Sequence, residues 1–313
     1  MIPSKQIVIE AGDRVAPFVH RTPVLTSRLL NEMVGAEVFF KCENLQKMGA
    51  FKMRGAINAI QQLSEAQKKA GVVTHSSGNF GQALALAAKN LGVNAYIVMP
   101  SSAPAVKIEA VKSYGGLVTI TEPTLEAREK SAANIVAEKG AVFLHPSNDM
   151  NVIVGQGTAA LELLQDQPGL EYIMSPVGGG GLIAGTALAA HYLGNNCRVI
   201  GAEPMEVDDA YRAFKSGKIE YNTSTDTIAD GLKTNLGDIN FPIIMELVSD
   251  IIRVEEGEIV NAMKLIWERM KLVIEPSSAV PFAALLKERE KFKNKKVGII
   301  LSGGNVELSN LPF

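Results

Sequence analysis

Pro176-Val-Gly-Gly-Gly-Gly-Leu-Ile-Ala184 begins at the end of an apolar stretch, 172–176, that is typical of a buried strand. Four consecutive glycines destabilise both helix and strand, so this turn must need their conformational freedom. A glycine-rich turn that opens a helix presents unpaired backbone N–H groups beside the positive end of the helix dipole. The stretch therefore predicts a phosphate site built from main chain, between a strand and a helix.

The same alternation of strand and helix extends over the rest of the chain. Apolar, β-branched stretches predict strands at 38–41, 72–75, 96–99, 117–120, 142–144, 172–176, 198–202, 251–254 and 297–301. Amphipathic stretches predict helices at 79–91, 125–139, 152–165 and 256–270. This order is typical of an α/β fold with open parallel sheets that helices cover on both faces. The units near the middle predict a small inserted domain, 70–146, within a large domain formed by 1–69 and 147–313.

The composition argues against several classes of protein. The 313 residues carry a formal net charge of −2, which gives no long-range attraction for nucleic acid or an anionic membrane. No stretch has the pattern of a membrane span, and the first residues lack that of a signal peptide. Cys42 and Cys197 have no C-x-x-C partner, which favours buried free thiols in a reducing, cytoplasmic compartment.

One lysine occupies a position suited to covalent chemistry. Lys52 lies between Phe51 and Met53, where a loop is expected to become a helix, 54–63. Burial among apolar groups favours the neutral amine, which can attack an aldehyde and form a Schiff base. Taken alone, the same lysine could also extend its amine to water from the start of an exposed helix.

Two further turns place small polar groups at the ends of expected strands. In Thr74-His-Ser-Ser-Gly-Asn79, the side chains of Ser76, Ser77 and Asn79 could bind a carboxylate at a helix N-terminus. Ser77 or Asn79 could instead simply cap that helix. Ser302 follows the last expected strand, at the edge where open α/β sheets bind ligands.

The glycine turn alone does not identify its phosphate. Gly179-x-Gly181-x-x-Ala184 also fits the dinucleotide-binding pattern, and Glu203 follows at about the distance expected of a ribose ligand. A nicotinamide-dependent (NAD) dehydrogenase is therefore an alternative. It leaves Lys52 and the Ser-Ser-Gly-Asn turn without a function.

Together these motifs resemble the fold-type-II pyridoxal-phosphate (PLP) enzymes, which have a tryptophan synthase β-like fold. The resemblance extends from Arg21-Thr-Pro-Val24 to Ser302-Gly-Gly-Asn305 and covers essentially the whole chain. Thr227-Ile-Ala-Asp-Gly231 and Trp267-Glu-Arg-Met-Lys271 are most similar to eukaryotic-type members of the serine racemase and serine/threonine dehydratase family. The resemblance implies a homodimer, with PLP in the cleft between two parallel-sheet domains.

The resemblance also implies the roles of individual residues. Lys52 would bind PLP covalently, Asn79 would bind its 3′-oxygen, and Ser302 would face its ring nitrogen. The cofactor would further be contacted by Phe51, Gly178, Gly179, Gly180, Gly181, Leu182, Gly231 and Glu275. The substrate would be bound by Ser76, Ser77, Asn79 and Arg128. A divalent cation, Mg²⁺, Mn²⁺ or Ca²⁺, would be bound by Glu203, Asp209 and the carbonyl of Val207.

The implied reaction begins when the Lys52 amine removes the α-proton of the substrate. Loss of the β-hydroxyl as water would then give an aminoacrylate, which hydrolyses to a keto acid and ammonia. A proton from Ser77 on the opposite face would instead give the other enantiomer. A neutral hydroxyl at Ser302 stabilises no charge on the ring nitrogen, which suits prompt elimination or reprotonation. Serine, threonine and 3-hydroxyaspartate are the candidate substrates.

The sequence departs from the family pattern in two places. Phe80 replaces the histidine that usually follows the motif asparagine, which leaves open a dedicated threonine or 3-hydroxyaspartate dehydratase. Gln82 and Asn305 match part of the nucleotide effector site of animal members, but Met48 departs from it, so we assign no activation by ATP. β-Replacement chemistry is a further alternative, against which the cation segment and the Trp267 motif argue.

Overall fold

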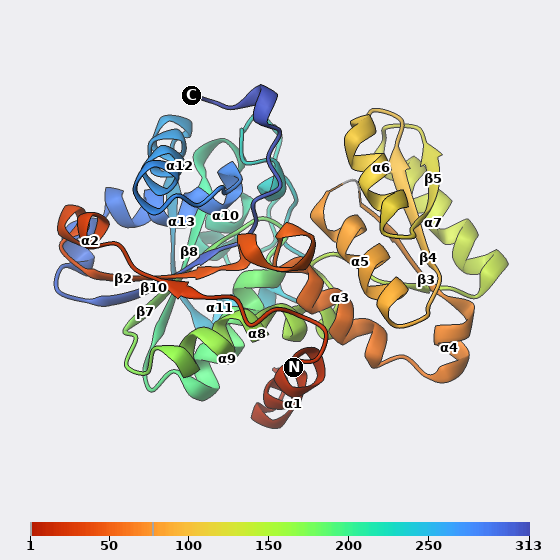
Figure 1. Cartoon of the computed structure of the whole chain (residues 1–313), viewed down its shortest axis with the longest axis horizontal. Coiled ribbons are helices and arrows are strands. Elements are labelled where there is room, and N and C mark those ends of the chain that lie inside the picture. The colour runs from red at the N-terminus through yellow and green to blue at the C-terminus, as the bar shows by residue number, and fades with distance from the viewer. Residues whose placement is uncertain (1, 77) are drawn as a thin grey trace.

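The computed structural model describes residues 2–76 and 78–313. The chain has two parts, each built around an open sheet (Figure 1). The larger sheet has the strand order β1-β2-β10-β7-β8-β9, and the smaller sheet has the order β5-β4-β3-β6. Every neighbouring pair of strands is parallel except β1 with β2. The predicted α/β class with open parallel sheets is confirmed.

The strands in the described residues are β1 (Val24–Leu25), β2 (Glu37–Cys42), β3 (Val72–His75), β4 (Ala95–Pro100), β5 (Leu117–Thr121), β6 (Val142–Phe143), β7 (Tyr172–Pro176), β8 (Arg198–Pro204), β9 (Val248–Val254) and β10 (Lys296–Leu301). The α-helices there are α1 (Lys5–Val15), α2 (Arg28–Val34), α3 (Lys52–Gln61), α4 (Glu65–Ala70), α5 (Asn79–Asn90), α6 (Ala105–Ser113), α7 (Leu125–Lys139), α8 (Met150–Asp166), α9 (Gly181–Leu193), α10 (Asp209–Ser216), α11 (Phe241–Leu247), α12 (Glu256–Met270) and α13 (Pro276–Lys287). Each predicted strand and helix corresponds to one of these elements, with ends that differ by at most a few residues.

The ends of the helices follow local sequence signals. The hydroxyl of Thr124 accepts a hydrogen bond from the amide of Ala127 at the start of α7, and Gly140 ends that helix in a left-handed conformation. The carboxylate of Asp149 caps α8 in the same way, by accepting from the amide of Val152. The two-residue strand β1 is not predicted, because so short a stretch carries no periodicity.

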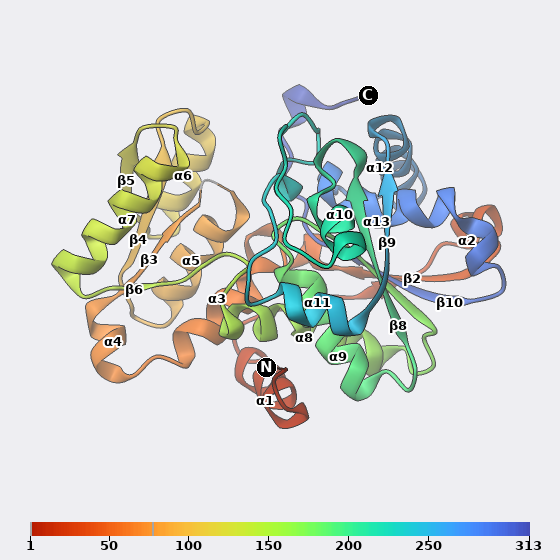
Figure 2. The ribbon, with the colours of Figure 1, turned by 180° about the vertical axis from the view of Figure 1, so that it is seen from behind.

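Helix α3 lies between the two sheets in both views of the ribbon (Figures 1 and 2). Its apolar residues Met53 and Ile57 belong to one buried cluster with Leu84 of α5. On another side α8 comes so close that a Cβ on Gly155 would lie 2.8 Å from the carbonyl oxygen of Arg54. Since α3 begins at Lys52, this packing fixes the place of the lysine between the two parts.

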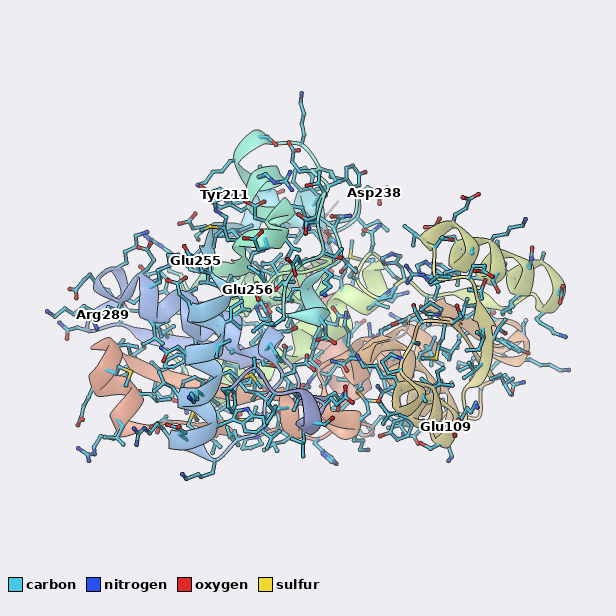
Figure 3. All side chains as sticks on the ribbon, turned by 90° about the horizontal axis from the view of Figure 1, so that it is seen from above. Glu109, Tyr211, Asp238, Glu255, Glu256 and Arg289 are labelled. Carbon is cyan, nitrogen blue, oxygen red and sulfur yellow. The ribbon has the colours of Figure 1, made fainter. Side chains whose placement is uncertain are left out.

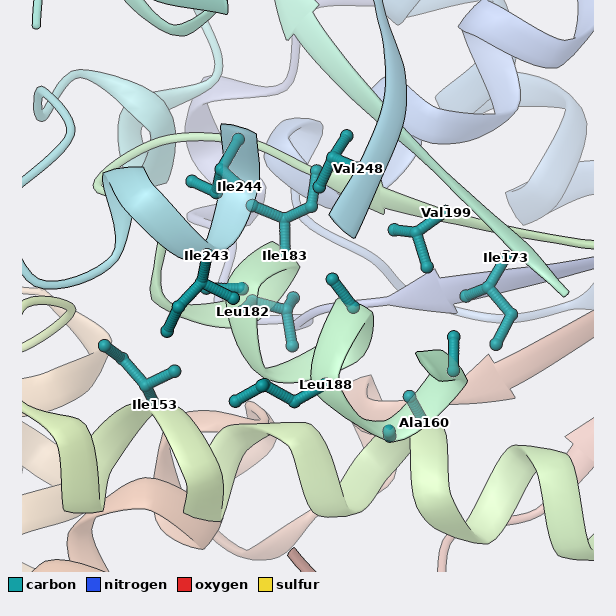
Figure 4. Packing of buried hydrophobic residues seen from close by; sticks show 14 of the residues in the cluster. Ile153, Ala160, Ile173, Leu182, Ile183, Leu188, Val199, Ile243, Ile244 and Val248 are labelled. Atoms are coloured by element: carbon teal, nitrogen blue, oxygen red, sulfur yellow. The ribbon is translucent and has the colours of Figure 1, made fainter. Parts of the chain in front are cut away.

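The apolar core of the larger part surrounds α9. Figure 4 shows Leu182, Ile183 and Leu188 of this helix among side chains of α8, α11 and the sheet. All of its first ten residues are buried. The glycine turn therefore leads into a helix whose orientation is set by core packing and not by solvent.

Parallel strands bring the predicted site residues to one edge of each sheet. β7 and β10 are neighbours in the larger sheet, so the turn after β7 and Ser302 after β10 lie at the same edge. Ser76 follows β3 of the smaller sheet. That sheet spans residues within the predicted insert, 70–146, whose boundaries stay a prediction.

Ionisable side chains cover both parts, for example Glu109 on the smaller part and Arg289 at the far end of the larger part (Figure 3). Among the described residues, none of the helices combines the length and the hydropathy that crossing a bilayer requires. Cys42 and Cys197 are free and buried, and burial raises the pKa of each thiol to about 12.

Candidate active site

The Lys52 amine lies near two aromatic rings and donates one hydrogen bond within the part of the chain that the structure describes. Its Nζ is 4.9 Å from the centre of the Phe51 ring and 5.8 Å from that of Phe80. Nζ donates to the carbonyl of Pro146 at 2.9 Å. Burial lowers the pKa of Lys52 to about 8, and the charge of Glu275 opposes this effect. The neutral form of the amine is therefore more accessible near physiological pH than that of an exposed lysine.

The glycine turn presents backbone amides that have no hydrogen-bond acceptor among the described residues. The amides of Gly178, Gly179 and Gly180 donate to no other described residue. Gly180 has a φ of +80°, which favours glycine, and a Cβ there would lie 2.6 Å from Oδ1 of Asn240. A Cβ on Gly178 would lie 2.8 Å from Cα of Leu232. The turn therefore has the composition and geometry of an anion cradle.

The segment Pro146–Ser147 connects the lysine to this cradle. Pro146 accepts from the Lys52 amine, and the carbonyl of Ser147 accepts from Nδ2 of Asn240 at 2.9 Å. The same Nδ2 donates to the carbonyl of Gly179 at 2.8 Å. Asn240 is fully buried and was not singled out from the sequence, because nothing near it in the chain indicates its distant partners.

Asn79, which is partly buried, forms a hydrogen-bonded pair with the buried Glu275. Nδ2 of Asn79 donates to both carboxylate oxygens of Glu275, and Asn305 donates to Oδ1 of Asn79 at 2.9 Å. The capping alternative is therefore wrong for Asn79, and the N-cap of α5 is Gly78. Burial, and then the charge of Asp230, raise the pKa of Glu275 to about 7.

Ser302 and Gly231 adjoin this pair. The hydroxyl of Ser302 is 3.0 Å from the hydroxyl of Ser278. The backbone carbonyl of Ser302 accepts from the amide of Phe51 at 3.0 Å. A Cβ on Gly231 would lie 3.8 Å from a carboxylate oxygen of Glu275. The structure thus brings Phe51, Lys52, Asn79, Glu275, Ser302, Gly231 and the glycine turn together from distant parts of the sequence.

The predicted substrate ligands are placed less completely. The hydroxyl of Ser76 is part-buried and accepts from the amide of Gly78 at 3.4 Å. Ser77 lies outside the described residues. Arg128 forms no ion pair with a described carboxylate, and its Nε donates to the carbonyl of Thr124 at 3.3 Å. Burial, and then the charge of Arg128, lower the pKa of His75 at the end of β3.

The predicted cation ligands lie in the larger part, after β8. Both carboxylates are fully buried, and the oxygens of Glu203 accept from the amides of Ala210 and Tyr211. Asp209 accepts from Asn222 and from the amide of Leu236. Burial and the charge of Asp209 raise the pKa of Glu203 well above its usual range, and burial raises that of Asp209 to about 6.

The described residues contain no group of three or more His, Cys, Asp or Glu side chains arranged for a metal. The predicted set, two carboxylates and the carbonyl of the buried Val207, is smaller than such a group, so it stays a prediction. A surface cavity of about 630 Å³, lined by His191, Cys197 and Arg198 among others, involves none of the predicted site residues.

Lys52 and the glycine turn together could engage a small ligand that carries both an aldehyde and a phosphate. Residues 15–303 match the model of the family described as pyridoxal-phosphate dependent enzyme, and the chain belongs to this family. The chain is 51% identical over 306 residues to a serine racemase of Dictyostelium discoideum. The matched region covers 96% of this chain and 94% of that protein. It is 48% identical over 312 residues to a beta-hydroxyaspartate dehydratase of Paracoccus denitrificans, with coverage of 100% and 99%.

The structural comparison agrees with this family. The structure of maize serine racemase matches with a TM-score of 0.96 at 46% identity, covering 99% of this chain and 95% of that one. The predicted PLP-enzyme fold is confirmed, and the NAD-dehydrogenase reading of the glycine turn is set aside.

Proposed function

We propose that this protein is a PLP-dependent serine racemase that also removes water and ammonia from L-serine and L-threonine. The observation that carries the proposal is the Pro146–Ser147 segment: the Pro146 carbonyl accepts from the Lys52 amine, and the Ser147 carbonyl shares the Asn240 amide with Gly179 of the glycine turn. An aldehyde and a phosphate on one small ligand would be engaged together by this arrangement. The names of the relatives, serine racemase and beta-hydroxyaspartate dehydratase, support this substrate class.

The residues present fit the proposed cofactor. The turn from Gly178 to Leu182 would hold its phosphate through backbone amides, and the Lys52 amine would bind its aldehyde. Asn79, Glu275, Gly231 and Ser302 would line the space around its ring. When PLP is joined to the amino group of a substrate, it draws electrons from the carbon that carries this group. The proton on that carbon then becomes acidic.

Lys52 would act as the base at that carbon. A pKa of about 8 allows Nζ to accept a proton and to release it again near neutral pH. The carbonyl of Pro146 offers an acceptor to the amine when it is not bound covalently. The Phe51 and Phe80 rings line one part of its surroundings, with centres 4.9 and 5.8 Å from Nζ. Ser77 would donate a proton on the opposite face, and this donation distinguishes racemisation from elimination.

The start of α5, with Ser76 and Asn79, would bind the substrate carboxylate. A second candidate function is a dedicated dehydratase of 3-hydroxyaspartate. Arg128 favours it, because its guanidinium has no carboxylate partner among the described residues and would suit a second substrate carboxylate. Threonine as the dedicated substrate of a dehydratase has no such support here.

The two buried carboxylates Glu203 and Asp209 would bind Mg²⁺, Mn²⁺ or Ca²⁺ together with the carbonyl of Val207 and water. Neither carboxylate is paired with a described Lys, Arg or His, and a bound cation would favour the ionised forms that burial disfavours. We extend the proposal to a homodimer, on the precedent of the family, and to a cytoplasmic location, which the buried free thiols of Cys42 and Cys197 favour.

The test is a visible spectrum of the purified protein, followed by product analysis with L-serine and with 3-hydroxyaspartate. We expect a cofactor band that Lys52→Ala abolishes, and both pyruvate and D-serine from L-serine. Ser77→Ala should lose D-serine formation. If only 3-hydroxyaspartate gives products, the protein is the dedicated dehydratase and not the racemase. If folded protein supplied with PLP shows no cofactor band, both candidate functions are refuted.

A further inference from the structure

A buried glutamine donates to the same backbone carbonyl as Lys52 does. Gln156 lies in α8 and is fully buried. Its Nε2 donates to the carbonyl of Pro146 at 3.1 Å. The Lys52 amine donates to the same carbonyl at 2.9 Å. The position of that carbonyl, and so of the amine, depends on Gln156.

The other end of the Gln156 amide faces the glycine turn. Its Oε1 is buried and has no hydrogen-bond partner among the described residues. The same oxygen lies 2.6 Å from the place that a Cβ on Gly181, the first residue of α9, would occupy. Buried amide oxygens without a donor are rare in folded proteins, so a donor is expected from a bound group.

Two glycines beside Gln156 keep it at a fixed place relative to both helices. A Cβ on Gly155 would lie 2.9 Å from Cα of Gly55 in α3. A Cβ on Gly157 would lie 3.0 Å from Cα of Gly185 in α9. With no side chain between the backbones, α8 touches directly both the helix that begins at Lys52 and the helix that begins at the cradle.

We propose that Gln156 is a positioning residue that couples phosphate binding at the cradle to the lysine. An amide with one hydrogen bond can rotate, whereas an amide whose Oε1 also accepts from an O–H donor is fixed. Such a donor is the hydroxyl of a hydrogen-phosphate group, or a water molecule held by it. Nε2 then holds the Pro146 carbonyl, and with it the Lys52 amine, in one place. The inference rests on the proposed PLP function.

The experiment measures whether two fragments of the cofactor help each other to bind the apoenzyme. Pyridoxal carries the aldehyde without the phosphate, and its reducible covalent adduct with Lys52 is quantified at increasing concentrations of inorganic phosphate. We expect phosphate to tighten pyridoxal binding to the native protein about tenfold. Gln156→Met, similar in volume but without an amide, should show almost no such coupling.

Thr158→Val is the matched control, because Thr158 is also buried on α8 but its hydroxyl bonds to Gly155 and Arg54. It should lose stability and keep the coupling. If Gln156→Met does not fold, Gln156→Asn serves instead, since it is one methylene too short to reach both partners and should also lose the coupling.

Native coupling in Gln156→Met, or no effect of phosphate on the native protein, would overturn the proposal. Failure of native apoenzyme to form an adduct with PLP itself would instead refute the proposed function. A pH series separates the two donors. Coupling that falls as pH rises through the second pKa of phosphate identifies its own hydroxyl, and coupling that persists identifies a water molecule.

Discussion

Nδ2 of Asn79 lies 3.2 and 3.1 Å from the two carboxylate oxygens of Glu275, although the residues are 196 positions apart. Asn79 begins α5 and Glu275 precedes α13, so this contact joins the start of one helix to the start of another. Glu275 is 4% exposed, and burial raises its pKa to about 7. A neutral carboxyl group can thus persist beside the lysine close to physiological pH.

The raised pKa of Glu275 predicts that the apoenzyme loses stability as the pH rises from about 4.5 to 7. In this range the folded protein keeps a proton that the unfolded chain has lost, so unfolding becomes easier. The loss should amount to about 2–3 kcal/mol. Urea unfolding at a series of pH values measures it. Glu275→Gln cannot ionise and should show a flatter dependence, and equal slopes in both proteins would contradict the assignment.

The lowered pKa of Lys52 makes the stability of the apoenzyme change with pH in the opposite direction. Below pH 8 the folded apoenzyme bears the cost of a buried ammonium, and this cost is relieved as the pH rises toward 10.5. Lys52→Met should therefore be more stable than the native apoenzyme at pH 7, by about 1–3 kcal/mol, although it cannot bind the cofactor covalently. Lys47→Met is the control for removal of a lysine. Thermal unfolding in which Lys52→Met is the less stable protein would refute the prediction.

Gly180→Ala should weaken PLP binding to the apoenzyme and destabilise the fold. The φ of +80° costs a side chain about 1–2 kcal/mol, and the new Cβ would also lie 2.6 Å from Oδ1 of Asn240. Gly169→Ala is a matched control, because its φ is +94° and its Cβ would meet nothing within 4 Å. The control should lose stability only. Equal cofactor affinity in the two variants would show that the turn does not bind the phosphate.

A buried cluster of ion pairs around Arg54 should dominate the stability of the region next to Lys52. Arg54 is fully buried and pairs with Glu43 at 2.7 Å and with Glu162 at 2.8 Å. Glu162 also pairs with Lys41. Glu162→Gln leaves two buried cations with one carboxylate and should cost about 3–5 kcal/mol.

The exposed pair of Arg28 and Glu32 provides the comparison for this cluster. Glu32→Gln should cost less than about 1 kcal/mol, because water screens an exposed pair. Chemical denaturation of both variants gives the difference. Similar losses would mean that water reaches the Arg54 cluster.

Addition of Mg²⁺ should raise the melting temperature of the protein, and a chelator should reverse the rise. A cation at 100 times its dissociation constant adds about 2.7 kcal/mol of stability. Asp209→Asn should abolish the response, whereas Glu206→Gln, which changes an exposed neighbour, should retain it. A response that survives in Asp209→Asn would place the cation elsewhere.

Much of this architecture follows from local signals in the sequence. The nine predicted strands and the predicted helices depend on periodicity and β-branched residues, which act over a few neighbours. Lys52 beside Phe51 and the four glycines after β7 have a chemical meaning that is also local. For this reason the α/β class, the lysine and the cradle could be predicted before any contact was known.

Contacts between distant residues could not be predicted in the same way. The partners of Asn240, of Gln156 and of the cluster around Arg54 lie far away in the sequence, and only the fold brings them together. Asn79 reads as a helix cap until Glu275 and Asn305 are placed beside it.

The sequence by itself determined which elements form and which groups can do chemistry, because backbone preference and side-chain character are properties of short stretches. The tertiary structure alone decided which groups meet, and with them the pKa of Lys52 and of Glu275. Burial and the approach of distant charges set those values, and both arise only when the two sheets and the helices between them pack together.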